Sequence, residues 1–180
     1  MKIRNGFVSN SSSSSFVVAF PKKPDTAEDV KEMMFGKQEW HYAGYYSDTG
    51  DVPTKDIADA VFKEVEDKES ASKLKVYKAI RHGYFDSYLL PELLPGSCSS
   101  WDETRDLKFP EDEKAIRAIW DKSEKTNDQR AMDIVNAFLG NHEDAFIATM
   151  WFADEDGSFW SMMEHSKIFG RLKHIKTSYH

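Results

Sequence analysis

Three runs of strand-forming residues lie near the two ends of the chain, and their positions limit the folds that it can adopt. Residues 16–20 and 146–152 are rich in β-branched and aromatic side chains, and residues 174–178 alternate in polarity. Such runs, bounded by turn residues, are typical of strands. Helical patterns are grouped between these runs instead of alternating with them, so the sequence predicts an α+β fold. We expect a small sheet of about three strands from the N- and C-terminal segments, packed with a helical middle region.

Helical patterns occur in six segments. Thr26, followed by Asp29, predicts a capped helix start. In the segment that begins near residue 70, we expect Leu74, Tyr77 and Ile80 to face inward. The turn-rich residues 37–53 predict a loop or an irregular hairpin. The six helices are expected over residues 26–36, 54–65, 70–82, 110–125, 128–140 and 158–170.

Length and composition narrow the class of protein. At 180 residues, 40% of them hydrophobic, the chain is expected to form one domain over residues 1–180 with a core of its own. Cys98 is the only cysteine, so no internal disulfide can form, which fits a reducing compartment. No apolar run approaches the roughly 18 residues that span a bilayer, and the N-terminus lacks a signal-peptide pattern. We therefore expect a cytoplasmic protein without membrane contact.

The net charge of −7 is unevenly distributed. Residues 1–24 and residues 166–180 each contain four Lys or Arg and no acidic residue, so the middle of the chain is strongly acidic. An acidic body argues against broad binding to nucleic acid. If the two ends meet in the fold, they form one local basic patch. The alternative is a chance clustering of charge at two exposed ends.

The most distinctive motif is a run of five serines: Ser11, Ser12, Ser13, Ser14 and Ser15. Consecutive hydroxyls beside exposed amides can accept an anion, and we expect Arg4, His174 and Lys176 nearby to favour it. The motif lacks the Gly-x-x-x-x-Gly-Lys-Ser pattern of a P-loop. A flexible segment and serines that only pack are the alternatives. Because only ten residues precede the run, we expect an ordered turn at the edge of the sheet, not a linker.

Aromatic residues make a second candidate surface: Trp40, Tyr42, Tyr45 and Tyr46. Such rings stack on bases or contact apolar side chains of a protein partner. Residues 40–46 include no Lys or Arg, which argues against nucleic acid. The alternative is an aromatic loop that folds onto the core.

Catalytic and metal-binding signatures are not found. The six histidines have none of the spacings expected of a zinc site, and in the adjacent pair Glu164–His165 the side chains are expected to point apart. No Gly-x-Ser-x-Gly elbow occurs, and nothing in the sequence places a histidine beside Cys98. The acidic turn at 154–157 lacks the later ligands of a calcium loop. We therefore predict no catalytic residue, metal or cofactor, and favour a binding protein over an enzyme.

The serine motif also carries a resemblance. The opening from Arg4 to Phe16, RNGFVSNSSSSSF, resembles the start of a set of uncharacterised proteins encoded by tailed bacteriophages, and some bacterial proteins begin similarly. The ending, with Met163-Glu164-His165 and residues 172–175, is similar to members of the same set. The resemblance covers residues 1–20 and 151–180. It implies a phage-encoded accessory protein made in the bacterial cytoplasm, and it implies no functional residue.

Three functions follow as hypotheses. The favoured one is a binding protein that occupies a protein of the host or the phage. The second is an enzyme or binding domain for a phosphate-bearing small molecule, using the serine run and the basic terminal segments. The third is an acidic mimic of nucleic acid that blocks a DNA-binding protein.

Overall fold

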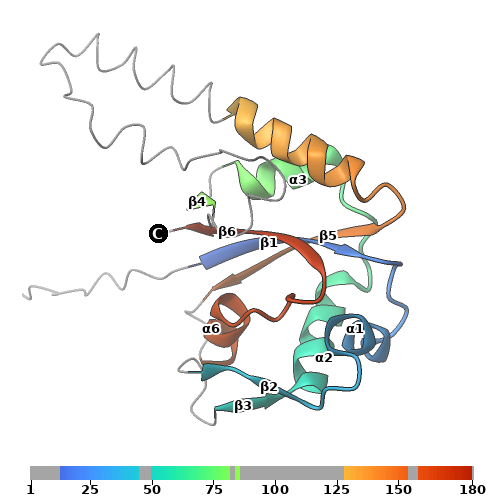
Figure 1. The fold of residues 1–180 in the computed structure, drawn as a ribbon, viewed down its shortest axis with the longest axis vertical. Coiled ribbons are helices and arrows are strands. Elements are labelled where there is room, and N and C mark those ends of the chain that lie inside the picture. The colour runs from blue at the N-terminus through green and yellow to red at the C-terminus, as the bar shows by residue number, and fades with distance from the viewer. Residues whose placement is uncertain (1–12, 45–49, 82–83, 86–127, 154–157, 180) are drawn as a thin grey trace, which may run out of the picture.

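The computed structural model describes residues 13–44, 50–81, 84–85, 128–153 and 158–179. Four strands form one sheet in the order β4-β6-β1-β5 (Figure 1). They are β1 (Ser13–Phe20), β4 (Tyr84–Phe85), β5 (Phe146–Ala153) and β6 (Lys173–Tyr179). A separate hairpin pairs β2 (Trp40–Tyr42) with β3 (Asp51–Pro53). The helices are α1 (Ala27–Phe35), α2 (Thr54–Val65), α3 (Lys73–Ile80), α6 (Ser158–His165) and a helix over residues 128–140.

The α+β fold, with a sheet built from the two ends of the chain, is confirmed. The three predicted strands pair in one sheet, in which β1 lies between β5 and β6 and runs antiparallel to both. Ser14, for example, lies opposite Phe152 on one side and Ser178 on the other. β5 and β6 therefore run parallel to each other without touching, and the basic C-terminal strand lies directly beside the N-terminal one.

Helices cover both faces of the sheet (Figure 1). One face, here called the α6 face, packs against α1, α2 and α6, and its core includes Phe16, Val18 and Phe20 of β1. The other, the α3 face, packs against α3 and the helix over residues 128–140, and its core includes Val17 and Ala19. Successive residues of a strand point to opposite faces, so an uninterrupted apolar strand such as β1 is what a sheet buried on both sides requires.

Local signals in the sequence account for several elements. Thr26 caps α1 through the capping box with Asp29, as predicted, and residues 37–53 contain the predicted hairpin. In α3 the prediction was wrong for Leu74, which is 60% exposed, while Val76 and Ile80 are buried. Val76 and Ile80, four residues apart, form the buried side of the helix, and Leu74, two residues before Val76, lies on the opposite side.

The serine run differs from the expected turn at the sheet edge. Its last three residues, Ser13, Ser14 and Ser15, begin the interior strand β1 and pair on both sides. Ser11 and Ser12 lie outside the described residues, as do Cys98 and the helix expected over 110–125. Within the described ranges, no helix combines the length and the apolar character that crossing a membrane requires.

Candidate functional site

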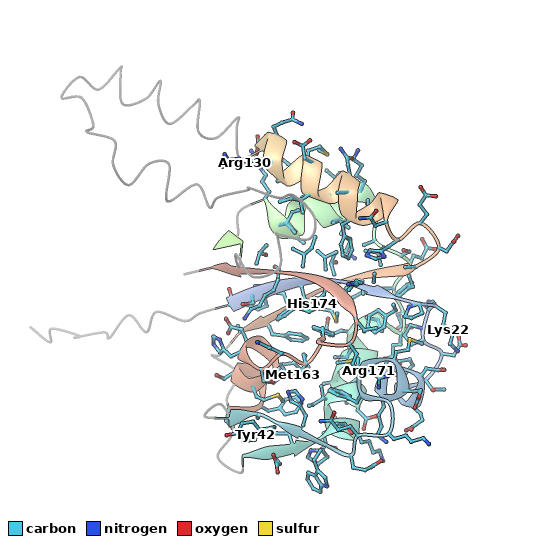
Figure 2. The ribbon with its side chains drawn as sticks, viewed as in Figure 1. Lys22, Tyr42, Arg130, Met163, Arg171 and His174 are labelled. Atoms are coloured by element: carbon cyan, nitrogen blue, oxygen red, sulfur yellow. The ribbon has the colours of Figure 1, made fainter. Side chains whose placement is uncertain are left out.

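The clearest candidate for a contact surface is the outer side of the β2–β3 hairpin. Trp40 is 58% exposed and Tyr42 is 74% exposed, although both are large and partly apolar. The register pairs Trp40 with Pro53 and Tyr42 with Asp51, and directly opposed residues share a face of the pleat. These four residues therefore form one outward surface, called here the aromatic face. Figure 2 shows Tyr42 at the end of the molecule opposite Arg130.

The inner side of the same hairpin is fixed to the core. His41, between the two exposed aromatics, points inward, where its Nε2 lies 3.0 Å from the Ser166 hydroxyl and its ring packs 5.6 Å from that of Phe35. Burial lowers the pKa of His41 below its usual value. Val52, paired with His41, packs against the core of the α6 face. The inward contacts leave Trp40 and Tyr42 facing solvent, because strand side chains alternate.

Hydrogen bonds also hold the ends of the hairpin. The Thr54 hydroxyl donates to the Gln38 carbonyl at 2.7 Å, and the Thr54 N–H donates to the Glu39 carbonyl at 3.0 Å. At the other end, the Ala43 N–H donates to the Gly50 carbonyl at 2.8 Å. The aromatic face is thus displayed on a braced backbone. Tyr45 and Tyr46, the other two aromatic candidates, lie outside the described residues.

A buried polar cluster joins the serine run to the end of α6. The Ser14 hydroxyl donates to Glu164 Oε1 at 3.1 Å, and His165 Nε2 lies 3.5 Å from Glu164 Oε2. Ser14 is fully buried and Glu164 is 1% exposed. The expectation that Glu164 and His165 point apart was wrong, since α6 ends at His165 and its side chain approaches the carboxylate.

The order of groups in this cluster limits its chemistry. A serine nucleophile is activated by a histidine, which a carboxylate then orients. Here the carboxylate of Glu164 lies between the hydroxyl and the imidazole, so Ser14 has the wrong neighbour for that role. The Ser14 hydroxyl already donates its one proton to Glu164, so it cannot donate that proton to an anion as well. The cluster is built to satisfy buried polar groups, which would otherwise cost stability.

His174 and Lys176 lie in β6, opposite Val18 and Phe16 of β1. His174 Nδ1 is 2.9 Å from the Leu172 carbonyl, and Figure 2 shows the residue near the middle of the sheet. Its pKa is lowered mainly by burial and further by the charge of Lys176. The Lys176 ammonium lies 5.8 Å from the centre of the Phe16 ring. Both candidates therefore flank the strand of the serine run, whereas Arg4 lies outside the described residues.

Sequence reasoning missed Glu164 and Ser166, which tie α6 to β1 and to the hairpin. The available signal was a charged residue that directly follows the apolar pair Met162 and Met163. Among the residues with described positions, no group of three or more His, Cys, Asp or Glu could hold a metal ion.

No protein-family model matches the chain, and the comparisons with curated proteins and with solved structures found no significant match. The aromatic face places two large exposed side chains on one short strand whose backbone is held by hydrogen bonds.

Proposed function

We propose that the protein is a phage-type accessory protein that binds a host or phage protein in the bacterial cytoplasm, and that the aromatic face is its contact surface. The observation that carries this proposal is the exposure of Trp40 and Tyr42 side by side on one strand. Aromatic residues of this size dominate the binding energy of protein interfaces.

The bracing of the hairpin supports the same function. A surface that is already ordered loses little conformational freedom on binding, and the free energy of association is correspondingly more favourable. His41, Thr54 and Val52 hold the strand that carries the two rings.

Charge around the aromatic face indicates the chemistry of the partner. Glu39 and Asp51 flank the two rings and are exposed. The ammonium of Lys31 lies 3.1 Å from Glu39 Oε1, and the Lys31 side chain is only 12% exposed. A partner with an apolar centre and a neutral or basic rim complements such a surface.

The test is affinity capture from infected cells, with the bound proteins quantified by mass spectrometry. We expect the double variant Trp40→Ala/Tyr42→Ala to lose partners that the wild type retains, because truncating such anchors typically costs about 2 kcal/mol or more each. Leu74→Ala is the matched control, since Leu74 is also large and 60% exposed but lies on α3. Equal capture by the double variant and the wild type, with both folded in thermal melts, would contradict the proposal.

A further inference from the structure

The sheet has two edges that differ in protection. At one edge, β6 carries Lys173 and Lys176, and β4 covers part of its length. At the other edge, β5 has the sequence FIATMWFA, without a charge or a proline. Natural proteins usually blunt an exposed edge with charges, prolines or a covering segment, because its unpaired backbone groups are a template for another strand.

The backbone of β5 shows which groups point outward from this edge. The Ile147 N–H donates to the Ser70 hydroxyl at 3.0 Å, and the Ile147 carbonyl accepts from the Ala71 N–H at 2.7 Å. Both Ile147 groups therefore point away from β1. In an antiparallel pair this direction alternates along the strand, so the N–H and carbonyl of Thr149, Trp151 and Ala153 point the same way.

Contacts from the residues that the structure describes cover the first of these outward positions. Ser70 and Ala71 occupy the position beside Ile147. Among the residues that the structure describes, nothing hydrogen-bonds to the outward backbone groups of Thr149 or Trp151. The Trp151 side chain is 57% exposed on the same stretch, although its cross-strand neighbour Ser15 is buried. The open part of the edge thus combines free backbone groups with an exposed indole.

We propose that a second copy of this chain pairs with this edge, β5 against β5 and antiparallel, about a two-fold axis beside Trp151. In this register Trp151 lies opposite its own copy, and Thr149 lies opposite Ala153 of the second copy. Each of the three outward residues then meets a residue with a complementary donor and acceptor. The two sheets become one continuous sheet.

The contacts of Ile147 with Ser70 and Ala71 favour this register over the one shifted by two residues. A shift of two residues would place Ala153 opposite Ile147 of the second copy, whose backbone groups are already bonded to Ser70 and Ala71. The register centred on Trp151 avoids that position. It also places the two exposed indoles on the same face of the joined sheet, as a cross-strand aromatic pair of the kind that stabilises sheets.

Because β5 has no charged residue, two copies of it can pair without charge repulsion between the strands. Each whole chain, however, carries a net charge of −7. The two copies therefore repel each other at long range, and salt screens that repulsion. Dimerisation is accordingly expected to strengthen as salt is added.

Sedimentation equilibrium of the full chain from about 1 µM to about 1 mM, a range of weak to moderate complexes, tests the proposal. We expect a monomer–dimer equilibrium that Trp151→Lys weakens by at least about tenfold, since like charges opposite each other destabilise a strand pair. Trp40→Lys, on the separate hairpin, is the matched control and should leave the equilibrium unchanged. If the wild type stays monomeric over this whole concentration range, the proposal is wrong, and a strand from another protein becomes the alternative partner for this edge.

Cross-linking tests the register independently. Hydrogen-bonded antiparallel residues have Cα atoms about 5.5 Å apart, which suits a disulfide. In a Cys98→Ser background, Trp151→Cys should form a covalent dimer under mild oxidation, and Leu74→Cys on α3 should not. Equal cross-linking of both variants, or none at residue 151, contradicts the register. Both experiments depend on Trp151, which lies in β5 and outside the aromatic face, so their failure leaves the proposed partner surface untouched.

Discussion

Phe152 and Trp151 are neighbours in β5 with opposite surroundings. Phe152 is 1% exposed and its ring lies 5.6 Å from that of Phe16 and 5.8 Å from that of Trp160. Phe152→Ala is expected to lower the free energy of unfolding by about 3–5 kcal/mol, because it leaves a cavity in the core. Trp151→Ala should change it by less than about 1 kcal/mol, because that side chain is mostly in water.

Denaturant unfolding measures the difference, with each variant at a concentration at which sedimentation shows it to be monomeric. Similar losses for the two substitutions would show that Trp151 is covered in solution. The sequence predicts that these residues face opposite sides, since strand side chains alternate. It does not predict which side is open, because that depends on β5 forming the edge of the sheet.

The buried Glu164 shows a second limit at this scale. The apolar residues beside it in the sequence predict a helix position that faces inward. A buried carboxyl group there needs a hydrogen-bond partner. One such partner is Ser14, which lies 150 residues away along the sequence. No local pattern reports a contact of this kind. The exposed Trp40 and Tyr42, by contrast, were among the aromatic surface candidates from the sequence.

Among the elements, α1 has an ending that constrains one residue tightly. Gly36 closes the helix with φ of 61°, in the left-handed region that other residues enter at a cost of about 1–2 kcal/mol. A Cβ at this position would also meet the guanidinium of Arg171. Gly36→Ala should therefore destabilise the protein by about 1–2 kcal/mol or more.

Gly140→Ala is the matched control. Gly140 lies in the helix over residues 128–140, and nothing occupies the space where its Cβ would be. This substitution is expected to stabilise the protein by about 0.4–1 kcal/mol, through the reduced entropy of the unfolded chain. Thermal or denaturant unfolding should therefore show a lower free energy of unfolding for Gly36→Ala and a higher one for Gly140→Ala. A change in the same direction for both variants would contradict the conclusion that the backbone conformation at residue 36 requires glycine.

Element types were largely predictable, because apolar spacing and caps are local. The start of β1 was not. Serine has little preference for strands, and a run of serines is typical of turns or linkers. Ser13–Ser15 are nevertheless strand residues, because β5 and β6 pair with them on both sides and tertiary pairing overrides local preference.

For the whole molecule, three histidines make stability depend on pH. Burial lowers the pKa of His41, His142 and His174, with Lys173 and Lys176 adding to the effect at the last two. The folded protein therefore binds fewer protons than the unfolded chain once the pH falls below about 6.5, the ordinary histidine value. Stability is fully present above that pH and is lost as the pH falls toward the folded pKa values.

Free energies of unfolding between pH 7.5 and 5 should decrease, with a contribution from His174 of at most about 1.4 kcal/mol per pH unit. His174→Gln should flatten the curve, because glutamine has no proton to gain. His180→Gln, at the end of the chain, serves as the control. A slope unaffected by His174→Gln would show that other groups govern the acid response.

The arrangement of the strands was the part of the fold that sequence left open. Local patterns predict that residues 16–20, 146–152 and 174–178 are strands, but they contain nothing about which strand lies in the middle. The structure places β1 in the middle. Its side chains pack with α1, α2 and α6 on one face of the sheet, and with α3 and the helix over residues 128–140 on the other.

The interior position of β1 has a consequence for how the protein is made. Its residues leave the ribosome well before those of β5 and β6, the two strands that pair with it. Until those strands have been made, this apolar segment has no native neighbour in the sheet, and contacts so distant in sequence form slowly. The sheet can close only after β6 has been synthesised, so the nascent chain must stay soluble by other means, and a fragment that lacks β5 and β6 exposes an apolar strand that chaperones and proteases would recognise.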